Sequence, residues 1–267
     1  MPKVDVLIPT FNRPEALAAT ITSLAYQTFQ DFDVIISNQG DHLELTNDAT
    51  LQTAARLLEQ RGRTITLLDN LPAKGMAHQR QFLLGHATAP YCLFLDDDIL
   101  LEPYVLRNLL QVLQEQQCGF TGNAVIGLSH KNDKRPKEQV IEFWNGRVQP
   151  ESITPDSPEW QRHKLHNAAN TLHVQEQHDI DPEHPRPYKI AWVGGCVMYD
   201  REKLLDSGGF SFWTELPAAH VGEDVLAELR VMQKYGGCGV LPSGAYHQQV
   251  KTTITDREVD APKWLKP

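Results

Sequence analysis

The sequence predicts an α/β fold in which a mostly parallel sheet is flanked by helices. Short apolar runs alternate with longer amphipathic stretches through the first half of the chain, and polar turns follow the runs. The runs expected to form strands are residues 4–8, 34–37, 64–68 and 91–95. Because the carboxyl ends of parallel strands share one edge of a sheet, we expect the turns after residues 8, 37 and 95 to converge there.

Amphipathic spacing predicts the helices between these strands. Pro14 suits a first helical turn, and Leu17, Ile21 and Leu24 fall on one face, which predicts a crossover helix. The leucines of residues 106–113 repeat the helical period and lead to an expected strand over residues 119–126.

The pattern changes at residue 129. Pro, His, Asn, Asp and Gln dominate residues 129–190, which predicts an irregular insertion or lid rather than a second core. Order returns with a strand-like run over residues 191–199, a Gly-Gly-Phe turn at 208–210, a helix ending near Tyr235 and a strand over residues 238–241.

Composition excludes several classes of protein. The chain has 267 residues and a formal charge of −9 without a basic cluster, which argues against nucleic-acid binding. Its four cysteines include no Cys-x-x-Cys pair, so we expect buried, reduced thiols. We see no signal peptide and no apolar stretch near the roughly 20 residues that cross a bilayer. These features favour a cytoplasmic protein.

Asp96, Asp97 and Asp98 directly follow the apolar run 91–95. Adjacent carboxylates repel one another unless a cation compensates, and hard oxygen ligands suit Mg²⁺ or Mn²⁺. The alternative is a solvated loop that caps the next helix. Three aspartates after so apolar a strand favour a site for a divalent metal and, through the metal, a phosphate.

Taken together, the motifs resemble those of the family two inverting glycosyltransferases, which use nucleotide sugars and have the GT-A type of Rossmann-like α/β fold. The resemblance covers most of the chain outside residues 129–190. The motifs that carry it are the run 6–14 (VLIPTFNRP), Lys74-Gly75 with Arg80, Asp96-Asp97-Asp98, Gly194-Gly195, Gly208-Gly209-Phe210 and Glu223-Asp224. The resemblance implies a nucleotide-sugar-binding half (1–128), an acceptor lid (129–190) and an acceptor or catalytic half of the same domain (191–267).

The same resemblance implies a donor site and a metal site. Asp98 is the expected ligand of Mn²⁺ or Mg²⁺, and His247 is either a further ligand or a surface histidine. Asp97 can point away, since successive side chains alternate. Arg80 is either a diphosphate contact or an exposed helical arginine. The residues expected to bind the nucleotide sugar are Pro9, Thr10, Phe11, Asn12, Arg13, Asn38, Lys74, Gly75, Arg80, Asp96 and Asp97.

An inverting transferase needs a carboxylate that takes the proton of the attacking hydroxyl. The resemblance implies Asp224 as this base, with Glu223 orienting it or binding the acceptor, and the two residues could exchange roles. A purely structural alternative is that both acids stabilise a helix N-terminus. Trp192, Gly194 and Gly195 are expected on the acceptor side.

The substrate is less well defined. Asn38 stands where the family commonly has an acidic residue that contacts the nucleobase, and an amide suits uracil, thymine or guanine. Family frequency favours a UDP-sugar. The expected acceptor is a glycan, a lipid-linked sugar or a small molecule, in polysaccharide or glycoconjugate synthesis by a hexosyltransferase. Peripheral association with the inner face of a membrane is compatible with such acceptors.

Three other readings compete. A nucleotidyltransferase would carry a Gly-rich basic loop after the first strand, but residues 9–12 contain no glycine. A phosphatase of the haloacid dehalogenase type has its Asp-x-Asp near the N-terminus, with a hydroxyl residue following. In this chain the aspartates stand at residues 96–98 and an isoleucine follows, which argues against that class. The altered stretch around Asn38 leaves open a non-catalytic GT-A module that binds sugar nucleotides or glycans.

Overall fold

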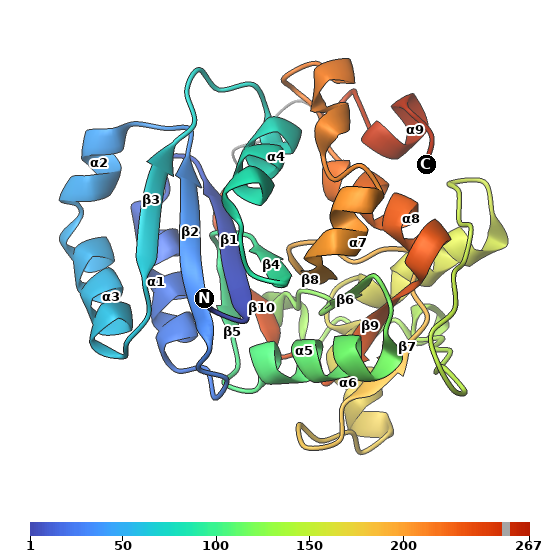
Figure 1. Cartoon of the computed structure of the whole chain (residues 1–267). Coiled ribbons are helices and arrows are strands. Elements are labelled where there is room, and N and C mark those ends of the chain that lie inside the picture. The colour runs from blue at the N-terminus through green and yellow to red at the C-terminus, as the bar shows by residue number, and fades with distance from the viewer. Residues whose placement is uncertain (253–256) are drawn as a thin grey trace.

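The structure, a computed structural model, describes residues 1–252 and 257–267. Within these residues eight strands form one sheet in the order β3-β2-β1-β4-β8-β6-β9-β7 (Figure 1). Only β8 and β7 run antiparallel to the others, which confirms the mostly parallel α/β prediction. The strands are β1 (Val4–Thr10), β2 (Phe32–Asn38), β3 (Ile65–Asp69), β4 (Tyr91–Leu95), β6 (Phe120–Gly122), β7 (Arg186–Tyr188), β8 (Cys196–Asp200) and β9 (Gly237–Leu241).

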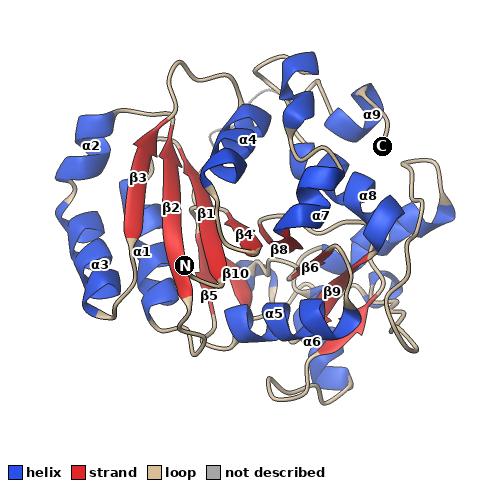
Figure 2. Cartoon of the chain, in the orientation of Figure 1, coloured by secondary structure: helices blue, strands red, loops and turns tan. Residues whose placement is uncertain are grey.

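Helices cover both faces of this sheet (Figure 2). Side chains alternate along a strand, so Val4, Val6 and Ile8 of β1 pack with α1, α3 and α5, whereas Leu7 packs on the opposite face with α4 and α8. The helices are α1 (Pro14–Ala25), α2 (His42–Asn47), α3 (Ala49–Gln60), α4 (Met76–His86), α5 (Val105–Gln116), α6 (Asn170–Gln177), α7 (Arg201–Asp206), α8 (Glu223–Tyr235) and α9 (Ala261–Trp264).

Two expected strands are shorter than predicted. The run over residues 191–199 enters the sheet only at Cys196, because Gly194 and Gly195 form a turn in which Gly195 has a φ of +79°. The strand expected over residues 119–126 ends at Gly122, after which Asn123 and Ile126 form separate backbone bonds to Cys196 and Ala245.

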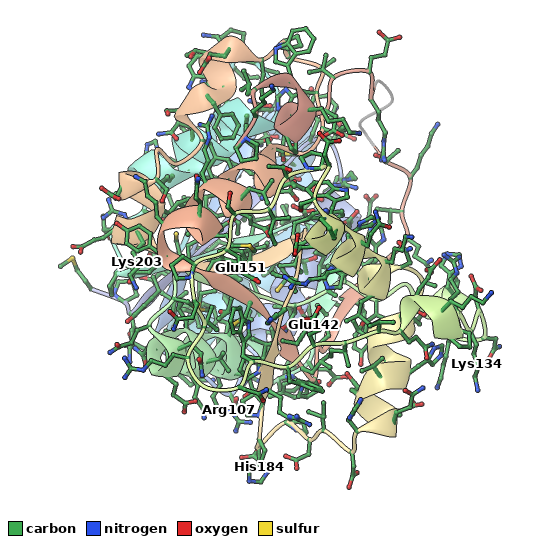
Figure 3. The ribbon with its side chains drawn as sticks, turned by 90° about the vertical axis from the view of Figure 1, so that its right-hand side faces the viewer. Arg107, Lys134, Glu142, Glu151, His184 and Lys203 are labelled. Atoms are coloured by element: carbon green, nitrogen blue, oxygen red, sulfur yellow. The ribbon has the colours of Figure 1, made fainter. Side chains whose placement is uncertain are left out.

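Residues 129–190 are mostly irregular, with short 3₁₀ turns and α6. Their last segment, β7, nevertheless pairs with β9 and forms one edge of the sheet. Arg162 binds both Glu142 and Glu151, which Figure 3 labels on this part of the chain. The insertion therefore packs onto the domain.

A separate two-stranded ribbon joins β5 (Ile99–Leu101) to β10 (Ala245–His247). It pairs His247 with Ile99 and so brings a residue near the end of the chain beside Asp98. The four cysteines are buried and unpaired, as expected. In the described part of the chain, no helix has the length and apolarity needed to cross a membrane.

Candidate active site

The turn after β1 is fixed by Asp97, which lies fully buried behind it. Thr10 Oγ1 donates to Asp97 Oδ2 at 2.7 Å, and Arg13 Nε donates to the same oxygen at 3.3 Å. Burial raises the pKa of Asp97 to about 7, although Arg13 and Thr10 favour its charged form. Thr10 and Asp97 therefore bind each other, and the contact of either side chain with a donor stays a prediction.

Asp98 lines a cavity of about 250 Å³, together with its neighbours Asp96 and Asp97. Its Oδ2 accepts a hydrogen bond from Arg13 Nη1 at 2.8 Å and lies 3.6 Å from His247 Nε2. Pro9 and Asp96 line the same cavity. The structure thus brings together Asp98 and His247, the two residues predicted to bind a metal.

Asp98 and His247 offer this cavity two atoms that could coordinate a divalent cation. A carboxylate oxygen and an imidazole nitrogen are both ligands of Mn²⁺, and Mg²⁺ prefers oxygen. Among the described residues no three His, Cys, Asp or Glu side chains form a metal-binding group, so diphosphate and water would complete the coordination. His247 Nδ1 accepts from Gln249 N at 2.6 Å, which leaves the proton of a neutral ring on Nε2. Ligation through Nε2 would require that proton to move.

Arg80 lies at the centre of the site, on the buried face of α4. Its side chain is only 4% exposed; Nη2 donates to Asp96 Oδ1 at 2.9 Å and Nε donates to Glu223 Oε1 at 3.0 Å. Burial lowers the pKa of Arg80, but the charges of Asp96, Glu223 and Asp224 outweigh it and raise the pKa overall. Arg80 is therefore buried, unlike an exposed helical arginine, and its contact with a diphosphate stays a prediction. It joins Asp96 to Glu223.

Glu223 and Asp224 begin α8 after Gly222, and their environments differ. Glu223 is buried and held by Arg80, whereas Asp224 is partly exposed and its Oδ1 accepts from Val225 N at 2.8 Å. Close packing, and then the charge of Glu223, raise the pKa of Asp224 to about 7. Of the two carboxylates, Asp224 is the more exposed.

The turn at residues 192–195 lies against this carboxylate. A Cβ built on Gly194 would stand 3.0 Å from Asp224 Oδ2, and Gly195 O accepts from Asp96 N at 2.9 Å. Trp192 stacks on His163 of the insertion, with the ring planes 8° apart. The turn expected on the acceptor side therefore contacts Asp96, Asp224 and the insertion.

Asn38, at the end of β2, is hydrogen-bonded to neighbouring residues. Its side chain is buried; its amide donates to Gly40 O and to Asp69 Oδ1, and its oxygen accepts from Gly40 N. The Asn38 amide is thus engaged by Gly40 and Asp69, and its contact with a nucleobase stays a prediction. Asp69, at the end of β3, is the partly exposed carboxylate here, and its Oδ2 lies 2.7 Å from His42 Nδ1.

The remaining expected donor residues lie around these turns. Phe11 is exposed, and Asn12 has a φ of +52° and accepts through Oδ1 from Asp41 N. Lys74 is exposed beside Trp213. Gly75 cannot carry a side chain, because a Cβ would lie 2.4 Å from Ala218 O.

Three further residues near the site were not predicted. Asp69 could have been found from its position after a strand, like Asp96. His220 Nε2 accepts from Ala77 N at 3.1 Å, at the start of α4, and Glu228 is buried one helical turn after Asp224. No local sequence signal marks these last two.

Comparison with known proteins identifies the family. The model of "Glycosyl transferase family 2" matches residues 5–178. A Campylobacter jejuni GalNAc(5)-diNAcBac-PP-undecaprenol beta-1,3-glucosyltransferase is 30% identical over 126 residues, which are 47% of this chain and 39% of that protein. An Escherichia coli UDP-Glc:alpha-D-GlcNAc-diphosphoundecaprenol beta-1,3-glucosyltransferase, WfgD, is 28% identical over 124 residues, 46% of each chain. The matches thus span less than half of either relative.

The fold also matches solved structures. The mannosyltransferase PcManGT from Pyrobaculum calidifontis, in complex with GDP-Man and Mn²⁺, superposes with a TM-score of 0.57 at 17% identity, covering 95% of this chain and 59% of that one. At that identity the likeness supports the GT-A fold alone. The family match covers more than half of the chain and includes the Asp96-Asp97-Asp98 motif, so the chain belongs to glycosyl transferase family 2.

Proposed function

We propose that this chain transfers a sugar from a nucleoside-diphosphate sugar to an acceptor hydroxyl, with inversion at the anomeric carbon and with a divalent metal. The observation that carries the proposal is the link through Arg80, which places the Asp96 end of the aspartate motif and the Glu223-Asp224 pair at one site. A donor-binding aspartate and a base on opposite sides of one sugar are what an in-line displacement needs.

In this proposal Asp224 is the base. Its pKa of about 7 leaves a large fraction ionised at neutral pH, yet basic enough to accept the acceptor's proton as the new bond forms. Glu223 is held by Arg80 and orients the start of α8. The turn at residues 192–195 and the insertion would bind the acceptor, and residues 1–128 the donor.

Asp98, with His247 as a second candidate, would hold Mn²⁺ or Mg²⁺. The bound metal would stabilise the negative charge that develops on the leaving diphosphate. The family match and the Mn²⁺ of PcManGT support a divalent metal. Arg13 already pairs with Asp98, so its guanidinium is placed to exchange that partner for a phosphate.

The names of the relatives support a donor class and an acceptor class. The Escherichia coli relative is named for UDP-Glc and PcManGT was solved with GDP-Man, so we propose a hexosyl donor, with uridine favoured over guanosine by family frequency. Because the Asn38 amide is bonded to Asp69, we propose that Asp69 and His42 contact the nucleobase. The undecaprenol-linked acceptors in the names of both relatives support a lipid-linked glycan acceptor at the cytoplasmic face of a membrane.

The test is thermal unfolding with uridine, guanosine, thymidine, cytidine and adenosine diphosphates, each with and without Mn²⁺. A ligand that binds only the folded state raises Tm by mass action. At one hundred times its Kd, such a ligand adds about 2.7 kcal/mol to the free energy of unfolding. We expect a Mn²⁺-dependent rise in Tm with one of the five diphosphates. In a separate turnover assay, we expect the protein to release that diphosphate from the corresponding nucleotide sugar. A folded protein that responds to none of the five contradicts the proposal and favours a module without donor chemistry.

A further inference from the structure

Glu228 is a buried carboxyl group that the proposed reaction does not use. It lies on α8 one turn after Asp224, and its side chain is 0% exposed. Glutamate is almost never fully buried without a charged partner. Its Oε2 accepts a hydrogen bond from Val193 N at 2.8 Å, while its Oε1 has no hydrogen-bond partner.

The groups around Glu228 do not compensate a negative charge. Asp224 approaches it from the same helix, Arg80 from α4 and Tyr199 from β8. The guanidinium of Arg80 is engaged by Asp96 and Glu223. Burial, and then the charge of Asp224, raise the pKa of Glu228 well above its usual range. Burial without a dedicated cationic partner among the described residues therefore favours the protonated, uncharged form of this side chain.

The bond to Val193 fixes the turn expected to bind the acceptor. In that turn Gly194 packs against Asp224 Oδ2, and Gly195 O accepts from Asp96 N. Glu228 and Asp224 share one helix and lie about 5–6 Å apart along its surface. A hydrogen bond from the turn to Glu228 thus sets where the turn stands relative to the carboxylate at 224.

We propose that Glu228 is a positioning residue, which as an uncharged acid ties the turn at residues 192–195 to the helix that carries Asp224. This rests on the proposed function, in which Asp224 is the base. An amide can accept the same N–H bond, so Glu228→Gln should preserve the turn. Leucine cannot accept it, so Glu228→Leu should release the turn.

The first measurement is Tm from pH 5 to pH 9 for wild type, Glu228→Gln and the exposed control Glu202→Gln. An acid whose folded pKa is raised contributes stability at low pH that is lost as pH rises above its unfolded value. The Tm of Glu228→Gln should therefore gain on wild type by about 3–5 °C per pH unit above pH 5. The control should follow wild type. A constant difference across this range overturns the uncharged acid.

The second measurement is amide hydrogen exchange of the peptide covering residues 190–196, with donor turnover measured on the same samples. Glu228→Leu should exchange about tenfold faster there and release nucleoside diphosphate from UDP-glucose or GDP-mannose at least about tenfold more slowly, whereas Glu228→Gln should stay near wild type in both. Unchanged exchange in Glu228→Leu, or faster exchange with undiminished turnover, overturns the positioning role. If wild type turns over neither donor while the exchange result holds, the proposed function fails and the tie to Val193 stands.

Discussion

Replacing Arg80 by Met should destabilise the protein through the carboxylates that it leaves behind. The Arg80–Glu223 pair spans 3.0 Å between side chains that are 4% and 6% exposed. Removing one partner of such a buried pair costs about 3–5 kcal/mol. The second partner, Asp96, is 35% exposed, and a pair of that kind adds at most about 1 kcal/mol. The total of about 3–6 kcal/mol corresponds to a fall in Tm of about 6–24 °C.

The loss should depend on pH. Without the guanidinium, which favours the charged form of Asp224, the folded-state pKa of Asp224 rises further, and an acid with a raised folded pKa loses its contribution to stability as pH rises. Urea unfolding followed by circular dichroism at pH 5.5 and pH 8 should therefore show the larger deficit at pH 8. Arg56→Met, on the exposed face of α3, is the matched control and should change stability by less than about 0.5 kcal/mol.

A second substitution separates charge from packing. Combining Arg80→Met with Glu223→Gln removes the uncompensated carboxylate, so the double variant should recover about 1–3 kcal/mol relative to the sum of the two single effects. Additive losses, or an Arg80→Met deficit below about 1 kcal/mol at pH 8, would refute the view that Arg80 holds these carboxylates together.

The other predictions concern the metal, the base and the link between helices. Asp98→Asn should weaken the Mn²⁺-dependent rise in Tm with nucleoside diphosphate, while the exposed control Asp156→Asn should not; an unchanged response removes Asp98 as the ligand. Asp224→Asn should leave that rise intact but slow transfer by about 10²–10⁴-fold. Wild-type transfer should increase about tenfold per pH unit up to pH 7 and level above, as expected for a base with a pKa of about 7. Burial lowers the pKa of His220, so its stabilising contribution should fade as pH drops below about 6.5. His220→Gln should lose this dependence and keep the bond to Ala77 N, whereas His220→Ala should lose about 1–3 kcal/mol in urea unfolding at pH 7.5.

The sequence could predict which turns meet but not where their side chains point. The ends of β1 and β4 converge because both strands are parallel and adjacent. The alternating pattern predicted parallel strands, whereas their adjacency is seen only in the structure. Whether Thr10 faces a ligand or Asp97 depends on a contact across 87 positions. The bond that engages the Asn38 amide could not be predicted for the same reason, since its partner Asp69 lies 31 positions away.

Glu228 and His220 show a second limit of sequence analysis. A glutamate four positions after Asp224 has the composition of a solvated helix face, and only the packing of the turn at residues 192–195 reveals that it is buried. His220 stands in a loop, where an exposed imidazole is the ordinary expectation, yet it accepts a bond at the start of α4. The helical period predicted α8, but which residues lie beneath another segment is decided by tertiary contacts.

The junction of α4 with α8 explains why these unpredicted residues matter together. Arg80 binds Glu223, His220 accepts from Ala77 N, and Gly75 lies too close to Ala218 for any side chain. One side of this junction carries the turn expected to meet the diphosphate, and the other carries Asp224. A shift of about 1 Å between the two would misplace the base relative to the sugar, and misplacement of that size costs about a hundredfold in rate. Substitutions at this junction should therefore lower kcat even though none of these side chains lines the cavity beside Asp98.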